Sequence, residues 1–355
     1  MSKEILKVFL LALFLGLWFQ GTRPFMGRDE HRYPQVARTM RSRGEWLVPY
    51  WEKHPHLTKP PVIYWMIAAG EKLFGSGPWG ARIPHALALA VTAAAIAALG
   101  AKLFGEEGFK AGFLYAVTLT PFVAANIVTP DTPLVMWEVL AAWAFFTRPL
   151  LAWVFWGLAF MTKGTAVFPV MLPFVWYGWL AKKDLRGLTK GLALFLLVAL
   201  PWHLYIQMRF PYFWKIFLKE EISGRLLHNY YHRNSAWYAP FYIYLPLLTV
   251  GALPGFVWFI RDFKGLRDLW REIHLRVILL WYAVPLTVFW LAKSRLPLYI
   301  LPLFAPFSLM VVGLRLKRGR ALPGPPFWGF WIAGLLVLKA ALSWYFKSHG
   351  IFPEP

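Results

Sequence analysis

The sequence has 355 residues, of which 58% are hydrophobic and only 15% are charged, and its mean hydropathy is +0.47. A chain of this composition has too little polar surface to cover a water-soluble globule of its size, so it belongs in a lipid bilayer. Its net charge of +21 indicates basic loops beside anionic lipid headgroups, and we do not expect nucleic acid as a partner.

Apolar segments near the length of a membrane-spanning helix recur along the chain, separated by short basic or Pro- and Gly-rich stretches. A backbone in lipid must satisfy its own hydrogen bonds, and segments of this length favour helices over a barrel. No small-residue cleavage site follows the first segment, so we interpret it as a retained span and not a signal peptide. The eleven predicted spans are 5–21, 83–101, 110–128, 132–147, 150–161, 165–180, 190–207, 238–260, 277–291, 297–314 and 326–345.

Short basic loops orient these spans. With a cytoplasmic N-terminus, the loops at 182–190, 261–271 and 315–320 all fall on the cytoplasmic side, as the positive-inside bias requires. We therefore predict a multi-pass membrane protein with a cytoplasmic N-terminus. The predicted outer segments are 22–82, the turns at Asp131 and Lys163, 208–237, and the turn holding Lys293 and Arg295.

One apolar segment, 61–74 (PVIYWMIAAGEKLF), is too short for a full span, and counting it as one would place the basic loops outside. We predict an interfacial helix there, on the outer surface. The chain ends soon after the last predicted span. We therefore expect one transmembrane unit, 1–355, with interfacial helices in the outer loop 22–82 and no separate C-terminal soluble domain.

The first outer loop carries ten Lys or Arg residues between Arg23 and Arg82, on the side where topology does not call for positive charge. Basic side chains at headgroup level neutralise lipid phosphates and stabilise a phosphate leaving group. The alternative is general binding to anionic headgroups, and Arg82 alone is open to interpretation as an interfacial anchor.

Acidic residues help to distinguish a catalytic site from general binding to anionic headgroups. Asp29 and Glu30 follow the first span, and Asp131 lies between the third and fourth spans, so the predicted topology puts all three at the outer interface. Carboxylates there suit a general base or a group that orients a sugar hydroxyl. An Asp before Thr-Pro is also a common helix N-cap, and for Asp131 that alternative stays open.

These motifs resemble a known family. DEHRY, GEWLVP, KPPVIYW, RIPHALAL, TPDTPLVMW, GLAFMTKG, PWHLYIQ and SRLPLYILPLFAP follow one another as in the aminoarabinose-transferase and protein O-mannosyltransferase group of GT-C glycosyltransferases. The resemblance covers almost the whole chain. It implies a multi-span helical core, of about eleven transmembrane helices here, in a bacterial-type inner membrane. The active site of such a core faces outward and takes a sugar from a polyprenyl phosphate such as undecaprenyl phosphate.

The resemblance also implies roles for individual residues. Asp29 matches the family's first-loop acid, and Asp131 matches the second acid; adjacent Glu30 joins them as a catalytic candidate. Lys59 in the KPP element, Arg225 and Tyr299 resemble residues that contact the donor's lipid phosphate. Further positive charge on the same face is expected from Lys163, Lys293 and Arg295.

A metal cofactor is not supported by the sequence. Lipid A aminoarabinose transferases usually have Glu where this chain has Thr58, so a metal contact through that position is not expected. His31, His54 and His56 offer imidazoles, but no carboxylate at matching spacing accompanies them.

The predicted function is inverting transfer of a sugar from a polyprenyl phosphate to a lipid A-like or other envelope acceptor. One alternative is protein O-mannosyl transfer, which shares the donor and differs in the acceptor. Another is a non-enzymatic transporter or flippase for polyprenyl-linked sugars. A transporter needs ionisable groups along the middle of its spans, whereas the acids and bases here are predicted at span ends.

Overall fold

The computed structural model describes residues 2–180, 183–219 and 233–349. Helices dominate these ranges, and the strands within them are the antiparallel pair β1 (Tyr50–Trp51) and β2 (His54–Pro55), which confirms the predicted all-α class. The α-helices are α1 Lys3–Leu17, α2 Gly27–Arg43, α3 Val62–Phe74, α4 Pro78–Phe104, α5 Lys110–Val117, α6 Leu119–Ala124, α7 Asp131–Thr147, α8 Pro149–Lys163, α9 Phe168–Val175, α10 Leu185–Arg209, α11 Phe213–Ile216, α13 Ala239–Thr249, α14 Gly255–Asp262, α15 Leu266–Arg271, α16 Ile273–Leu291, α17 Phe304–Lys317 and α18 Pro325–His349. Shorter 3-10 or π segments are η1 Glu106–Phe109, η2 Gly164–Val167, η3 Trp176–Leu180, η5 Val250–Ala252, η6 Phe263–Gly265 and η7 Pro297–Leu303.

The number of long spans differs from the prediction. Within the described ranges, five helical segments have the length and apolarity to cross a membrane, or six if the pair bent by 92° between η5 and α14 counts as one. Eleven were predicted, because shorter helices such as α1, α7 and α16 are also apolar and resemble spans in sequence. The five segments are Pro78–Phe104, Pro149–Leu180, Leu185–Arg209, Pro297–Lys317 and Pro325–Ser348.

The segment Pro149–Leu180 is helical almost throughout, yet the chain reverses within it. Gly164 has a φ of +70°, outside the helical region, and the rings on either side of it pair in antiparallel order. Phe160 lies 5.6 Å from Phe168, Trp156 6.0 Å from Phe174, and Trp153 5.0 Å from Trp179, measured between ring centroids. The predicted turn at Lys163 is therefore present, and α8 and α9 form a hairpin.

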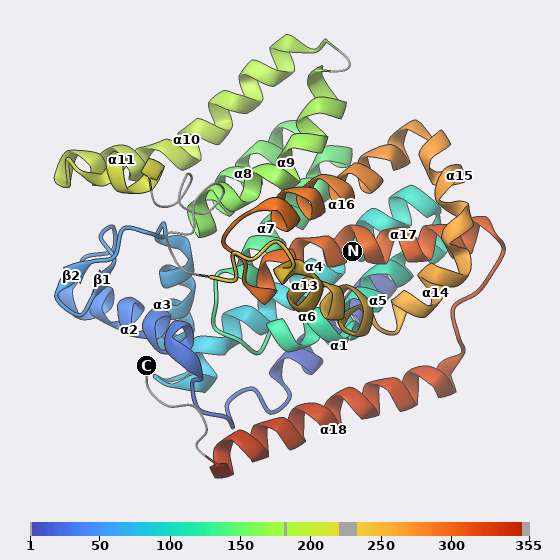
Figure 1. The fold of residues 1–355 in the computed structure, drawn as a ribbon, viewed down its shortest axis with the longest axis horizontal. Helices are drawn as coiled ribbons and strands as arrows, with labels where there is room; N and C mark the ends of the chain where they lie inside the picture. Colours follow the sequence, from blue (N-terminus) through green and yellow to red (C-terminus); the bar gives the residue numbers. More distant parts are fainter. Residues whose placement is uncertain (1, 181–182, 220–232, 350–355) are drawn as a thin grey trace.

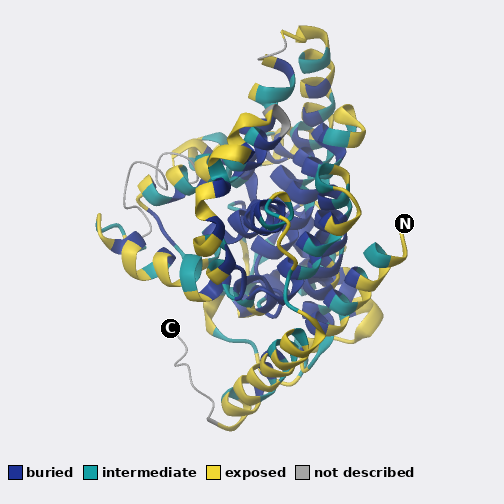
Figure 2. Ribbon diagram, turned by 90° about the vertical axis from the view of Figure 1, so that its right-hand side faces the viewer, coloured by how far each residue is buried: buried dark blue, intermediate teal, exposed yellow. Residues whose placement is uncertain are grey.

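At the centre of the bundle, α4 packs against α1, α3, α5 and α7. Small residues bring α5 close: a Cβ added to Gly112 would lie 2.1 Å from the carbonyl oxygen of Ala93. Such contacts are typical of membrane bundles, where close backbone packing takes the place of a hydrophobic driving force. Figure 2 shows burial concentrated in the central helices, whereas α18, which runs along the edge of the bundle in Figure 1, is mostly exposed.

The bundle has two chemically different ends, which α17 connects. At one end Asp262 is fully buried and accepts hydrogen bonds from Arg315, Arg318 and Arg320 at 2.6–3.3 Å. At the other end η7, which precedes α17, carries Tyr299. The basic loop at 315–320 thus lies at the end opposite to Tyr299.

The loop 22–82 forms a layer of its own at the Tyr299 end. There α2 packs on α3 through buried residues that include Tyr33, Val36 and Ile67, and the β1–β2 hairpin lies against α2. With 13 residues, α3 agrees with the helix predicted over 61–74 and is shorter than a span.

Candidate functional site

A small polar pocket lies where the 22–82 layer meets the ends of the bundle helices. It has a volume of about 90 Å³. Five of the residues predicted to act together line it: Asp29, Lys59, Asp131, Lys163 and Tyr299. The other lining residues are Arg32, Tyr33, His56, Thr58, Thr129, Pro130, Arg233 and Leu296.

The buried centre of the pocket is an ion pair between Asp131 and Lys163. Asp131 is the first residue of α7, and its carboxylate binds Lys163 instead of capping the helix, for Pro130 is the N-cap residue. The reversal at Gly164 brings Lys163 to this point, where its Nζ also lies 4.5 Å from the ring centroid of Tyr299. The ion pair thereby connects the first residue of α7 with the last residue of α8 at the pocket wall.

Asp29 enters the pocket from α2 and is more accessible than Asp131. Its side chain is 37% exposed and accepts a hydrogen bond of 2.5 Å from Arg32, one turn further along the helix. Burial alone would lower the pKa of Arg32, but Tyr33, Asp29 and Tyr64 raise it overall, so Arg32 stays cationic. Burial raises the pKa of Tyr33, which stays protonated. Asp29 therefore faces the pocket with a fixed positive partner.

Lys59 reaches the pocket from the loop before α3. It is buried, and its Nζ donates to the carbonyl oxygen of Thr58 at 2.9 Å. The hydroxyl of Thr58 lies 3.1 Å from Nε2 of His56. Among the described residues no group of three His, Cys, Asp or Glu side chains is arranged to hold a metal ion, and both His31 and His54 are exposed.

Arg233 is a pocket residue that the sequence analysis missed. Its guanidinium lies 3.5 Å from the hydroxyl of Tyr299. The residue chosen from this loop, Arg225, lies outside the described residues. Arg233 stands in the same basic loop as Arg225, and charge alone gave no means of choosing between them.

Three predicted residues lie outside the pocket lining. Lys293 is exposed. Arg295 is buried and donates to the backbone carbonyls of Trp290, Asn234 and Ala236, which fixes the loop and leaves the guanidinium directed at backbone. Glu30, the third, belongs to a different network.

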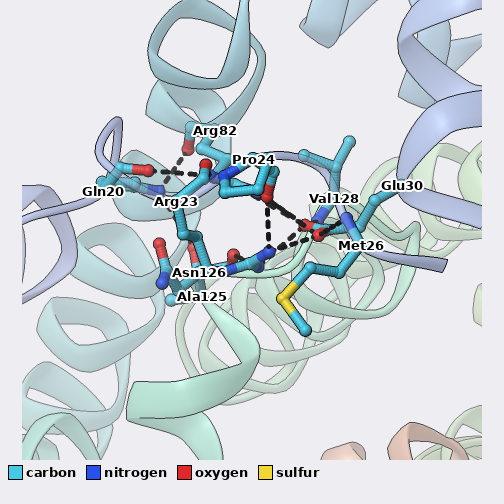
Figure 3. A network of polar contacts seen from close by, with 9 residues as sticks. All are labelled: Gln20, Arg23, Pro24, Met26, Glu30, Arg82, Ala125, Asn126 and Val128. Atoms are coloured by element: carbon cyan, nitrogen blue, oxygen red, sulfur yellow. Dashed lines mark hydrogen bonds and ion pairs between the residues drawn. The ribbon is translucent and has the colours of Figure 1, made fainter. Parts of the chain in front are cut away.

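Figure 3 shows that network. The carboxylate of Glu30 accepts from Arg23 at 2.5 and 2.9 Å, from Arg82, and from the backbone N–H of Val128. Arg82 is fully buried and also donates to the carbonyls of Gln20, Arg23 and Pro24, so it is not an interfacial anchor. Because helix positions are about 100° apart, Glu30 turns to the interior while Asp29 faces the pocket.

The Glu30 network predicts a pH effect on stability. Burial raises the pKa of Glu30, but Arg23, Arg82 and the Val128 N–H together bring it below its ordinary value of 4.5. The carboxylate therefore stabilises the fold fully above pH 4.5, and this contribution is lost as the pH falls through the lower folded-state pKa. We expect Glu30→Gln to reduce the free energy of unfolding at pH 7 by about 3–5 kcal/mol, because it leaves Arg23 and Arg82 buried without a negative partner.

Unfolding of the purified protein in detergent at pH 7 and at pH 4 measures this effect. The destabilisation caused by Glu30→Gln should shrink at the lower pH. An equal loss at both pH values would contradict the assigned charge state.

A larger apolar cavity of about 600 Å³ adjoins the pocket. Five residues line both spaces, namely Asp29, Thr129, Asp131, Leu296 and Tyr299. The cavity continues between α6, η5 and η7, and Val250, 57% exposed, is one of its wall residues at the protein surface. The charged pocket and the apolar cavity thus share part of their walls.

Glu138 is an ionisable residue within α7, in the segment 132–147 that was predicted as a span. It lies two turns beyond Asp131 in α7, is 1% exposed, and its carboxylate oxygens have no hydrogen-bond partner within the described part of the chain. The expectation that acids and bases occur at span ends is wrong for this residue and for Lys339 of α18, which is also buried.

Known structures share this arrangement of helices. ArnT from Cupriavidus metallidurans bound to undecaprenyl phosphate is similar with a TM-score of 0.75 and 24% identity, over 95% of this chain and 63% of that chain. The Archaeoglobus fulgidus oligosaccharyltransferase is similar with a TM-score of 0.56 and 14% identity, over 96% of this chain and 52% of that chain. The fold is that of the GT-C membrane glycosyltransferases.

Sequence relatives narrow the class to a family. A family model described as dolichyl-phosphate-mannose-protein mannosyltransferase matches residues 58–205. Two undecaprenyl phosphate-alpha-4-amino-4-deoxy-L-arabinose arabinosyl transferases from Pseudomonas fluorescens strains are each 31% identical, covering 98% and 90% of this chain and 67% and 61% of the relatives' lengths. The chain belongs to the aminoarabinose transferase family of the GT-C superfamily.

The chain spans about two thirds of the length of these relatives. Its long apolar helices and its relatives identify it as a multi-span protein of the bacterial inner membrane.

Proposed function

We propose that this chain is an inverting glycosyltransferase, which moves a sugar from a polyprenyl-phosphate donor, such as one built on undecaprenyl phosphate, to a lipid A-like or other envelope acceptor. The observation that supports this proposal is that a charged pocket and an apolar cavity lie side by side and have five lining residues in common. A lipid phosphate needs both environments at once, because its head is anionic and its tail is hydrocarbon.

In the proposed reaction, the acceptor oxygen attacks the anomeric carbon from the face opposite the polyprenyl phosphate. The new bond from that carbon to the acceptor forms as its bond to the phosphate oxygen breaks. Asp29 orients the acceptor hydroxyl and takes its proton, with Asp131 in support. If the acceptor is itself a phosphate it is already ionised, and Asp29 then only positions it.

The phosphate that departs carries negative charge and needs nearby donors. Lys59 and Tyr299 are assigned this role, together with Arg233, whose guanidinium lies beside the Tyr299 hydroxyl. Arg225 stays in the proposal through the family resemblance alone. The buried cation Lys163 holds Asp131 in place.

The proposed topology has a cytoplasmic N-terminus and an active site on the outer face. Its support is the separation of charge along the bundle: the basic loop around Arg315 lies at the end opposite the pocket.

Transfer by the purified chain in detergent tests the function, because no membrane then separates two compartments. Labelled sugar on undecaprenyl phosphate is supplied with lipid A, and labelled lipid A is the expected product. A transporter would yield no product. Since the family model that matches 58–205 is described as a protein mannosyltransferase, a Ser/Thr peptide serves as the competing acceptor.

Lys59→Ala should raise the KM for the polyprenyl-phosphate donor about tenfold or more, since a hydrogen bond to a charged group contributes about 1.5–3 kcal/mol. Lys293→Ala is the matched control, because that lysine is exposed and outside the pocket lining. Initial rates over a range of donor concentrations measure both. Equal KM values for the two variants would remove Lys59 from the phosphate site.

A further inference from the structure

A second cavity, of about 230 Å³, lies between α18 and the bundle. Most of its wall is apolar, and Val123, Leu338 and Leu342 on its border are 38–40% exposed at the protein surface. It shares Val123, Ile127 and Leu338 with the apolar cavity described above, but neither Asp29 nor Asp131 lines it. It is therefore a neighbouring space and not part of the polar pocket.

Polar groups converge on this cavity from both sides. Lys339 is 4% exposed and its Nζ donates to the carbonyls of Leu15 and Gly16 at 3.0 and 2.8 Å; an ammonium group has three donors. Ser343 lies one turn further on the same face of α18, is 1% exposed, and its hydroxyl has no hydrogen-bond partner among the described residues. Across the cavity, Oδ1 of Asn126 is likewise unpaired within the described ranges.

The charge of the lining favours an anion. Arg23, Glu30 and Lys339 contribute charge to the wall, and Arg23 and Glu30 are bound to each other. Lys339 is therefore the basic group of the lining that has no acidic partner there, and it lies beside the Ser343 hydroxyl. Lys339 and Ser343 lie against apolar walls that border the lipid-facing surface. An amphipathic molecule from the membrane accepts their hydrogen bonds and also covers the apolar walls, whereas a soluble anion leaves those walls uncovered.

We propose that this cavity is a second lipid site, which binds an anionic phospholipid. Its head group takes the hydrogen bonds offered by Lys339 and Ser343, and one acyl chain fills the apolar part. Only 17% of the apolar window of α18 is buried in protein, so the lipid supplies packing that holds this helix to the bundle. The proposal does not depend on the glycosyltransferase function.

The sequence has no cysteine, which makes a site-specific test possible. Leu342→Cys places a fluorophore at the cavity, and Val337→Cys places one on the same helix at a position that is 67% exposed. The full chain in detergent is titrated with phosphatidylglycerol carrying brominated acyl chains, which quench nearby fluorophores. We expect saturable quenching at Leu342→Cys and only weak, linear quenching at Val337→Cys.

Brominated phosphatidylcholine should need about tenfold more lipid to reach half-saturation, because it lacks a net negative charge to pair with Lys339. Ser343→Leu, added to Leu342→Cys, fills the cavity and should abolish the saturable component, while thermal unfolding shows that the variant is folded. Excess undecaprenyl phosphate should not displace the bound lipid. Equal quenching at both positions, equal response to both lipids, saturation that survives Ser343→Leu, or displacement by undecaprenyl phosphate would each overturn the proposal.

Discussion

We expect Asp29→Asn to lower the rate of sugar transfer to a hydroxyl acceptor by about 10²–10⁴-fold, the usual contribution of a positioned general base. The asparagine keeps the shape of the side chain and removes its ability to take a proton. Stability should change little, because the Asp29 side chain is 37% exposed and its ion pair with Arg32 is local to α2. Turnover by the purified enzyme at saturating donor measures the effect.

Glu30→Gln is the matched control for this experiment. Glu30 is adjacent in sequence but is held by Arg23 and Arg82 away from the pocket, so its replacement should reduce stability more than rate. Activity near that of the unmodified enzyme for Asp29→Asn would remove Asp29 from the catalytic mechanism. Activity that is retained with a phosphate acceptor and lost with a hydroxyl acceptor would support the role of Asp29 as the base, because an ionised acceptor has no proton to remove.

The second large effect concerns the ion pair of Asp131 and Lys163, whose side chains are 8% and 7% exposed. Replacing either partner alone leaves an uncompensated buried charge, so Asp131→Asn or Lys163→Met should each reduce the free energy of unfolding by about 3–5 kcal/mol. The double variant should lose less than the sum of the two, because neither charge remains.

Denaturant or thermal unfolding of the single and double variants in detergent measures the coupling free energy between Asp131 and Lys163. The pair Asp268 and Arg271 offers a control, since its side chains are 60% and 66% exposed and removal of either should have little effect. Additive losses at Asp131 and Lys163 would show that the pair is not coupled.

The sequence contained enough to place several site residues together. The length of the apolar segments and the charge of the loops predicted which span ends share a side of the membrane, and Asp29, Lys59 and Asp131 do line one pocket. Side-chain direction was harder to predict. Asp29 and Glu30 are adjacent, yet one residue of helix rotation separates a pocket residue from a buried structural one.

Positive charge alone was a poor guide to function. Arg295 was predicted to add positive charge on the same face as Lys163 and Lys293, but its buried guanidinium donates to backbone carbonyls. Arg32 was overlooked because it pairs with Asp29 only when both residues lie one turn apart on a helix. The boundaries of the helices within the loop 22–82 were not predicted. Glu138 was overlooked because one acid within an apolar helix barely alters the hydropathy of that segment.

The five residues that line both the charged pocket and the apolar cavity have a kinetic consequence. In the proposed reaction, the lipid-borne donor enters the apolar cavity sideways from the bilayer, past the exposed wall residue Val250, and so reaches Asp29 and Asp131. Turnover should then follow the mole fraction of donor among the surrounding amphiphiles. At fixed bulk concentration, adding inert detergent or phospholipid should slow the reaction by surface dilution.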